Sequence, residues 1–272
     1  IQMMTSNHSD RTPLYNMALL EKVNLDKALE IYKARFANPA DFTFIFVGNI
    51  DPKDAKTQEL ICTWLGGMKT KKNCHESIID HHVTVAPGIQ KNYFSRAMET
   101  TTASNRIQYT SYDIPFTMAN DLNMEIIGRI LSTRYLESIR EREGGSYGVG
   151  TYGYMTSLPT PTAALLMQFD TDPNKQERLM QIIHEEVQTI IENGPLANDL
   201  QKEKESMLKD FQEDLEKNTF WRSTLYQYYM YGINEVRDYK AAVEAISAES
   251  VQTLLKKLVE AGNVIEVVMF PE

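Results

Sequence analysis

Arg140 and Tyr147 lie seven positions apart in the chain (147 − 140), on either side of the glycine pair Gly144 and Gly145. Arginine presents several N–H donors in a fixed fork, and tyrosine presents one phenolic O–H donor. Two such donors can hydrogen-bond one acceptor group of a ligand. We therefore single out Arg140 and Tyr147 as candidate ligand-binding residues.

Both residues also allow a purely structural interpretation. Arg140 has glutamates close by in the sequence with which it could form an ion pair, namely Glu137, Glu141 and Glu143. Tyr147 could be an ordinary residue of a β-sheet. On the residues alone, this structural interpretation is favoured.

The elements that position the pair are a helix and a strand. Residues 118–136 form an apolar, proline-free run that favours a buried helix, with only Gly128 against it. The helix is expected to stop at the glycine pair, because glycine adopts the left-handed C-cap without strain. Residues 146–154 alternate aromatic, β-branched and glycine residues, which predicts a strand whose glycines admit another backbone or a ligand. Such a strand at or near a sheet edge could pair with an extended peptide.

A cluster of histidines could instead indicate a metal site. Cys74, His75, Asp80, His81 and His82 lie within one polar stretch and could bind zinc through mixed ligands. The spacing is irregular, however, and adjacent histidines rarely share one ion. A solvated linker is the favoured interpretation, so we expect no metal ligands in this chain.

His184 and Glu185 offer a second, weaker metal pattern. Together with Glu186 they lie in a predicted helix, but Gln188, one turn further on, is not a metal ligand. We expect all three to form a surface helix face. Neither the H-E-x-x-H motif of zinc peptidases nor its inverted form H-x-x-E-H occurs, so no catalytic residue is assigned in this chain.

Composition limits the function classes. The 272 residues are 42% hydrophobic and 24% charged, which is typical of a globular chain with a sizeable core. A net charge of −9 argues against nucleic acid or an anionic membrane as the main partner. No apolar run approaches the roughly 20 residues that span a bilayer. Cys62 and Cys74 do not make a disulfide framework, and the first residues resemble an interior part of a longer polypeptide.

The order of elements predicts an α+β fold, with a largely antiparallel sheet covered by helices on one face. A buried strand is expected at residues 41–50, where the sequence reads DFTFIFVGNI, and a linker at 73–91. Further strands are expected at 92–98, 106–113, 162–171 and 264–270, and helices at 172–191 and 197–217, with a last helix capped by Ser247. The tyrosine-rich stretch 226–231 is interpreted as core or interface packing.

Four stretches resemble the pitrilysin/insulinase family of zinc metallopeptidases. IYKARFANPA followed by DFTFIFVGNIDP resembles the end of an odd-numbered domain of that family, and LESIREREGGSYGVG resembles its segment L-R-E-x-x-G-x-x-Y. KNTFWRSTL and SAESVQTLLKKL are similar to late family positions. The resemblance covers nearly the whole chain.

The resemblance implies two homologous halves, each of two α+β domains, that close around a peptide. The N-terminal half carries zinc through H-x-x-E-H, and the C-terminal half lacks this motif and supplies substrate contacts. By this resemblance, residues 1–72 are the C-terminal part of a preceding domain, 73–91 a linker, and 92–272 a C-terminal inactive peptidase-like domain. Arg140 and Tyr147 would reach the peptide near the metal.

The implied partners are the N-terminal half of the same polypeptide and a peptide substrate, and zinc is expected in the full-length protein but not on this chain. No peptidase activity is therefore expected from the chain alone. The resemblance also suggests the bacterial periplasm. The alternative is a catalytically inactive relative that acts as a scaffold or a protein-interaction subunit.

Overall fold

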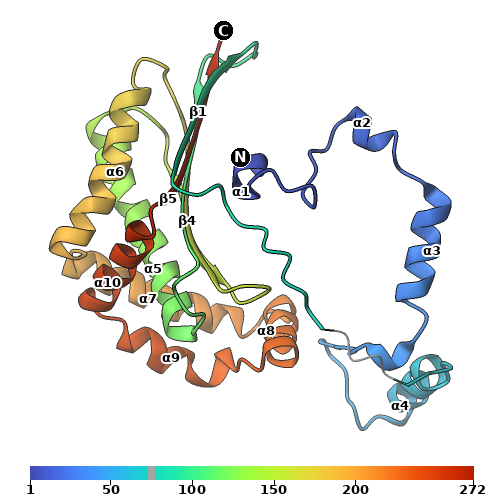
Figure 1. Cartoon of the computed structure of the whole chain (residues 1–272). Helices are drawn as coiled ribbons and strands as arrows, with labels where there is room; N and C mark the ends of the chain where they lie inside the picture. The colour runs from blue at the N-terminus through green and yellow to red at the C-terminus, as the bar shows by residue number, and fades with distance from the viewer. Residues whose placement is uncertain (73–76) are drawn as a thin grey trace. The chain divides into compact units, whose positions relative to one another are not determined.

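The computed structural model describes residues 1–72 and 77–272 (Figure 1). Its internal contacts divide the chain into two compact units. The first unit consists of Ile1–Thr12, Asp80–Phe211 and Arg237–Glu272, and the second consists of Pro13–Ile79 and Gln212–Val236.

The first unit is built on a five-stranded sheet with the strand order β1-β5-β2-β4-β3. The strands are β1 (Ile89–Arg96), β2 (Ala103–Ser111), β3 (Gly150–Thr156), β4 (Thr162–Thr171) and β5 (Asn263–Pro271). β1 pairs with β5 in parallel, and the other neighbours are antiparallel. This confirms the predicted α+β class with a largely antiparallel sheet, and it makes β1 and β3 the two edge strands.

Helices cover one face of this sheet, as Figure 1 shows. They are α5 (Met118–Tyr135), α6 (Gln176–Asn193), α7 (Ala197–Asp214), α9 (Glu235–Ala245) and α10 (Ala248–Glu260), while α1 (Gln2–Thr5) is a single short turn. Apolar residues of α5, α6 and α10, such as Ile127, Ile183 and Leu255, are completely buried against strand residues such as Ile107 and Leu165. Their burial supplies the main driving force for this layer.

α10 begins as the sequence predicts. The Ser247 hydroxyl accepts a hydrogen bond from the Ser250 main-chain N–H, and the Ser250 hydroxyl accepts one from Ser247 in return. Such reciprocal caps satisfy donors that the first helical turn would otherwise leave unpaired.

Two glycines bring α5 into direct contact with β3. A Cβ atom on Gly153 would lie 1.8 Å from the main-chain oxygen of Met124, and one on Gly128 would lie 2.5 Å from the Gly153 nitrogen. Only glycine fits at either position, because any side chain would separate helix from strand. The prediction that the strand glycines admit another backbone is confirmed, and Gly128 in the buried helix is explained.

The second unit contains short helices with few buried side chains. They are α2 (Met17–Leu20), α3 (Leu25–Arg35), the 3₁₀ turn Pro39–Asp41, α4 (Ala55–Ile61), the π-helical turn Cys62–Gly66 and α8 (Asn218–Tyr231). Within the described residues, none of the helices before β1 has a buried side chain.

The predicted buried strand at residues 41–50 is wrong. The segment contains no strand, and Phe42, Phe44 and Phe46 are exposed, with 37%, 47% and 54% of their surface accessible. The Phe42 ring contacts Phe36 and Phe44 instead, with ring centroids 5.4 and 6.2 Å away. The reason is that a strand forms only against a neighbour, and the described residues provide none here.

Several other boundaries and burial assignments also differ. β1 starts at Ile89, inside the expected linker, and the tyrosines of stretch 226–231 are exposed or half-buried, so that stretch is not core. Among residues 1–72 and 77–272, every helix is too short or too polar to span a lipid bilayer.

Candidate functional site

Arg140 lies on a widened helical turn. α5 ends at Tyr135 and continues directly as a π-helical turn, η3 (Leu136–Arg142). Ile139 is buried in the core, while the next side chain, Arg140, is exposed. π-helical turns are rare and are often found at functional sites, because they re-aim one side chain relative to a regular helix.

The turn that follows η3 is anchored by hydrogen bonds. Gly144 adopts the left-handed conformation with φ +56°, as predicted for a glycine that ends a helix. The Gly145 N–H donates to the Ile139 carbonyl at 3.1 Å, and the Thr171 hydroxyl donates to the Gly145 carbonyl. The Lys175 ammonium donates to the carbonyls of Glu143 and Gly144 at 2.8 and 3.3 Å. The turn is therefore tied to the end of β4 and the start of α6.

Two of the three glutamates near Arg140, Glu137 and Glu143, are occupied by other partners. Glu137 pairs with Arg134 at 2.9 Å and with Arg142 at 2.7 Å. The hydrogen bond from Arg142, together with the positive charges of Arg134 and Arg142, lowers the pKa of Glu137. Glu143 pairs with Arg178 at 3.5 Å.

Arg140 itself makes no ion pair and no side-chain hydrogen bond with any residue that the structure describes. Its guanidinium is thus available to a ligand, and the ion pairs offered by the structural interpretation are absent among the described residues.

Tyr147 is 97% exposed and lies in the loop before β3. The predicted strand at 146–154 begins later, at Gly150, so Tyr147 is not a sheet residue. Within the described part of the chain, its phenolic oxygen has no hydrogen-bond partner. The structure therefore presents two exposed, unpartnered donors on the two arms of one anchored turn.

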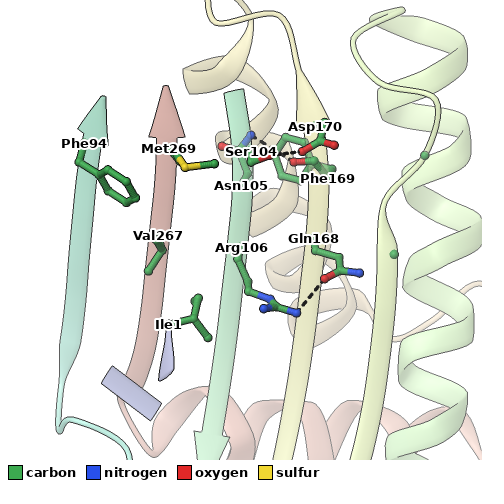
Figure 2. A pocket seen from close by; sticks show the side chains of 12 residues that line it. Ile1, Phe94, Ser104, Asn105, Arg106, Gln168, Phe169, Asp170, Val267 and Met269 are labelled. Carbon is green, nitrogen blue, oxygen red and sulfur yellow. Dashed lines mark hydrogen bonds between the residues drawn. The ribbon is translucent and has the colours of Figure 1, made fainter. Parts of the chain in front are cut away.

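The same loop leads to a cavity of about 620 Å³ on the sheet face opposite the helices (Figure 2). Gly148 and Gly150 form its border on the side of the turn. Its other lining residues include the apolar side chains of Phe94, Val267 and Met269 and the polar side chains of Ser104, Arg106, Gln168 and Asp170. Arg106 donates to the Gln168 side-chain oxygen at 2.9 Å, and Ser104 donates to Asp170.

Metal ligands do not gather in the described residues. No group of three His, Cys, Asp or Glu side chains there could hold an ion. Of the candidate cluster, Cys74 and His75 lie outside the described residues, while His82 Nδ1 lies 3.3 Å from an Asp80 carboxylate oxygen.

The prediction of a surface helix face is confirmed for Glu185, which is exposed, but it is wrong for His184 and Glu186. The His184 ring is half-buried and turns toward the sheet, where Nδ1 lies 2.6 Å from the Tyr109 hydroxyl and Nε2 lies 2.9 Å from Glu266. Glu186, two positions further along the same helix, is also buried and pairs with Arg134 at 3.3 Å. Both side chains turn inward because each pairs with a charged residue there: His184 with Glu266 of β5, and Glu186 with Arg134 of α5.

Glu266 is the centre of this polar network. Its side chain is 3% exposed, and it accepts a hydrogen bond from Tyr93 at 2.8 Å and an ion pair from Lys91 at 2.9 Å, besides His184. Burial by itself raises the pKa of a carboxyl group, but His184, Lys91 and Tyr93 outweigh it and lower the pKa of Glu266 to about 2. Burial and the nearby charge of Glu266 raise the pKa of Tyr109.

Sequence reasoning missed both Arg106 and Glu266. Each is a charged residue inside a predicted strand, within the sequences ASNRIQYTS and NVIEVVMFP. A charge in an apolar strand requires a partner or a ligand, and that signal could have identified both positions.

Comparison with protein families matches residues 22–207 to the family described as the peptidase M16 inactive domain. The chain is 24% identical over 213 residues to a zinc protease PQQL-like protein of Arabidopsis thaliana, covering 74% of this chain and 22% of that protein. The fold is similar to the periplasmic protease PqqL of Escherichia coli, with a TM-score of 0.79 and 18% identity, and to pitrilysin, with a TM-score of 0.59 and 12% identity.

The chain corresponds to only part of these proteins. All of it superposes on 30% of PqqL, and 99% of it superposes on 29% of pitrilysin. At these identities, the two structures establish the fold alone.

Proposed function

The chain belongs to the family of the peptidase M16 inactive domain, and from this premise we propose that it is the non-catalytic C-terminal half of a zinc-dependent endopeptidase. In this proposal it closes over a peptide held by the other half of the polypeptide and donates hydrogen bonds to it. The observation that carries the proposal is the anchored turn with two exposed donors, Arg140 and Tyr147, which have no partner in the described part of the chain.

Zinc belongs to another part of the complete protein in this proposal, because the described residues offer no set of ligands that fits the ion. Bound there, zinc would supply an activated water and polarise the scissile carbonyl. This chain would contribute fixed donors. The Arg140 guanidinium and the Tyr147 hydroxyl would donate to the peptide carbonyls, and their attraction grows as charge develops on the oxygen.

The edge strand β3 follows directly after the Tyr147 loop and supports the same proposal. One side of β3 pairs with β4, and the other side has no strand partner among the described residues. The Met155 N–H on this edge donates to Asp121 of α5 at 3.1 Å, so the start of β3, before Gly153, is the part to which an extended peptide could add through main-chain hydrogen bonds. The peptide would then leave the turn along β3.

The test is mutation of the two donors in the complete polypeptide. Arg140→Ala or Tyr147→Phe is expected to lower peptide turnover about a hundredfold, as for other lost oxyanion donors. The melting temperature should hardly change, because neither side chain has a partner to lose among residues 1–72 and 77–272. Arg142→Ala is the matched control: it removes an exposed arginine of the same turn that is paired with Glu137. Variants that turn over substrate normally but melt early would refute the assignment.

The alternative, an inactive relative that serves as a scaffold, makes a different prediction for the same polypeptide. Its preceding half would lack H-x-x-E-H, and purified protein would show no peptidase activity at any zinc concentration. Peptide cleavage that depends on H-x-x-E-H in the preceding half would exclude it.

A further inference from the structure

The guanidinium of Arg106 lies on the face of the sheet opposite the helices and is only partly hydrogen-bonded. Arg106 comes from β2, the middle strand, and its side chain points into the cavity beside Gln168 (Figure 2). One terminal nitrogen donates to Gln168, but Nε is shielded from solvent and has no hydrogen-bond partner among the described residues. No described carboxylate pairs with this charge either.

A guanidinium in this state is a site for an anion. Shielding a charged donor from water without giving it a partner is unfavourable, and a bound acceptor removes that penalty. Phe94, Val267 and Met269 line the same cavity and would exclude water from the contact, which strengthens it. The planar arginine fork matches a carboxylate, which can accept two parallel hydrogen bonds.

Asp170 limits the kind of anion that fits. Its carboxylate lies on the border of the same cavity, where it accepts from Ser104 and does not pair with Arg106. Its negative charge repels a dianion such as a phosphate group about twice as strongly as a single carboxylate. The cavity therefore favours a carboxylate with an apolar stem, such as a glutamate side chain.

We propose that this cavity is a specificity pocket for a carboxylate of the bound peptide, with Arg106 as the residue that recognises it. The inference rests on the proposed function, because it requires a peptide at the Tyr147 turn. Gly148 in the loop and Gly150 at the start of β3 connect the two places, because both follow Tyr147 and border the cavity. Neither carries a side chain, so a peptide backbone can approach them closely.

The test measures equilibrium binding of labelled peptides by the complete polypeptide. One series carries a single glutamate at successive positions of a neutral sequence, and each member is matched to the same peptide with glutamine. We expect the glutamate form to bind about tenfold to a hundredfold more tightly at one position, the range for a hydrogen-bonded charge. In Arg106→Gln this preference should disappear.

Two further variants make the result specific. Arg96→Gln removes another arginine of the same sheet that lies outside the cavity, and it should keep the preference. Arg106→Lys keeps the charge but loses the fork, so it should keep only part of the preference. If Arg106→Gln fails to fold, the loss of preference is measured with Arg106→Lys instead. A second set of measurements compares peptides with a free and with an amidated C-terminus. Tighter binding of the free form that depends on Arg106 supports the pocket, with the peptide C-terminus as the bound carboxylate.

Two outcomes would overturn the pocket. The wild-type polypeptide could bind both forms equally, or Arg106→Gln could keep the wild-type ratio. Neither depends on turnover by the Arg140 and Tyr147 variants, so a failure of the pocket can be separated from a failure of the proposed function.

Discussion

Glu266→Gln should destabilise the chain at neutral pH, and the loss should fade as the pH falls. Glutamine keeps the size of the side chain but removes the charge that holds Lys91 and faces His184. A pKa lowered from 4.5 to about 2 corresponds to a ceiling of about 3 kcal/mol. Lys91 is more than half exposed, so solvent screens its share, and we expect about 1–3 kcal/mol.

The sign follows from linkage between protonation and folding. Because the pKa of Glu266 is lower in the folded chain, its contribution is complete above the unfolded value of about 4.5 and is lost as the pH falls toward about 2. About three quarters of it should remain at pH 4 and about two fifths at pH 3, by the same relation. Urea unfolding of wild type and variant at pH 7, 5, 4 and 3, followed by circular dichroism, measures the difference. A difference that is equal at pH 7 and pH 3 would refute the charge-based explanation.

Three further predictions concern packing, the turn and metal. Gly153→Ala should cost about 3 kcal/mol in thermal unfolding, because its Cβ would collide with the Met124 carbonyl, whereas Gly148→Ala, which faces open space, should be nearly neutral. Lys175→Met should loosen the turn before β3 and lower peptide turnover by the complete polypeptide, with little change in its melting temperature. Titration calorimetry of the chain with zinc should show no tight one-to-one binding; such binding would point to the histidine cluster after all.

Elements whose signals are local were predictable from sequence. β4 has the predicted bounds, because its apolar run ends at a turn signal, Asp172 followed by Pro173. Ser247 caps α10 through bonds to residues within one turn, so no distant contact decides its position. The end of the central helix before Gly144 follows from a conformation that glycine alone adopts without strain.

Elements whose state depends on distant partners were not predictable. The apolar residues Phe42, Phe44 and Phe46 have the composition of a buried strand, but a strand needs a neighbour to pair with, and the described residues do not supply one. His184 is similar: its helical spacing predicts a solvated face, and only the position of Glu266, far away in the sequence, turns the ring inward. Propensity describes what a residue can do, and tertiary contacts decide between the alternatives.

Only the part of the candidate site that is close together in the sequence could be predicted, again because local signals can be read and distant contacts cannot. Arg140 and Tyr147 are visible as a pair because a short turn connects them, whereas Arg106 becomes visible only through the alternation of β2. Asn105 and Ile107 on that strand are buried toward the helices, and Arg106 between them must therefore face the opposite side. The alternation can be read from the sequence, but it does not tell which face the helices cover. Once that face is known, Arg106 on the other face, with no carboxylate partner among the described residues, becomes a residue that requires a ligand. The peptide proposed to bind at Tyr147 would supply that ligand, because the loop after Tyr147 leads to the cavity.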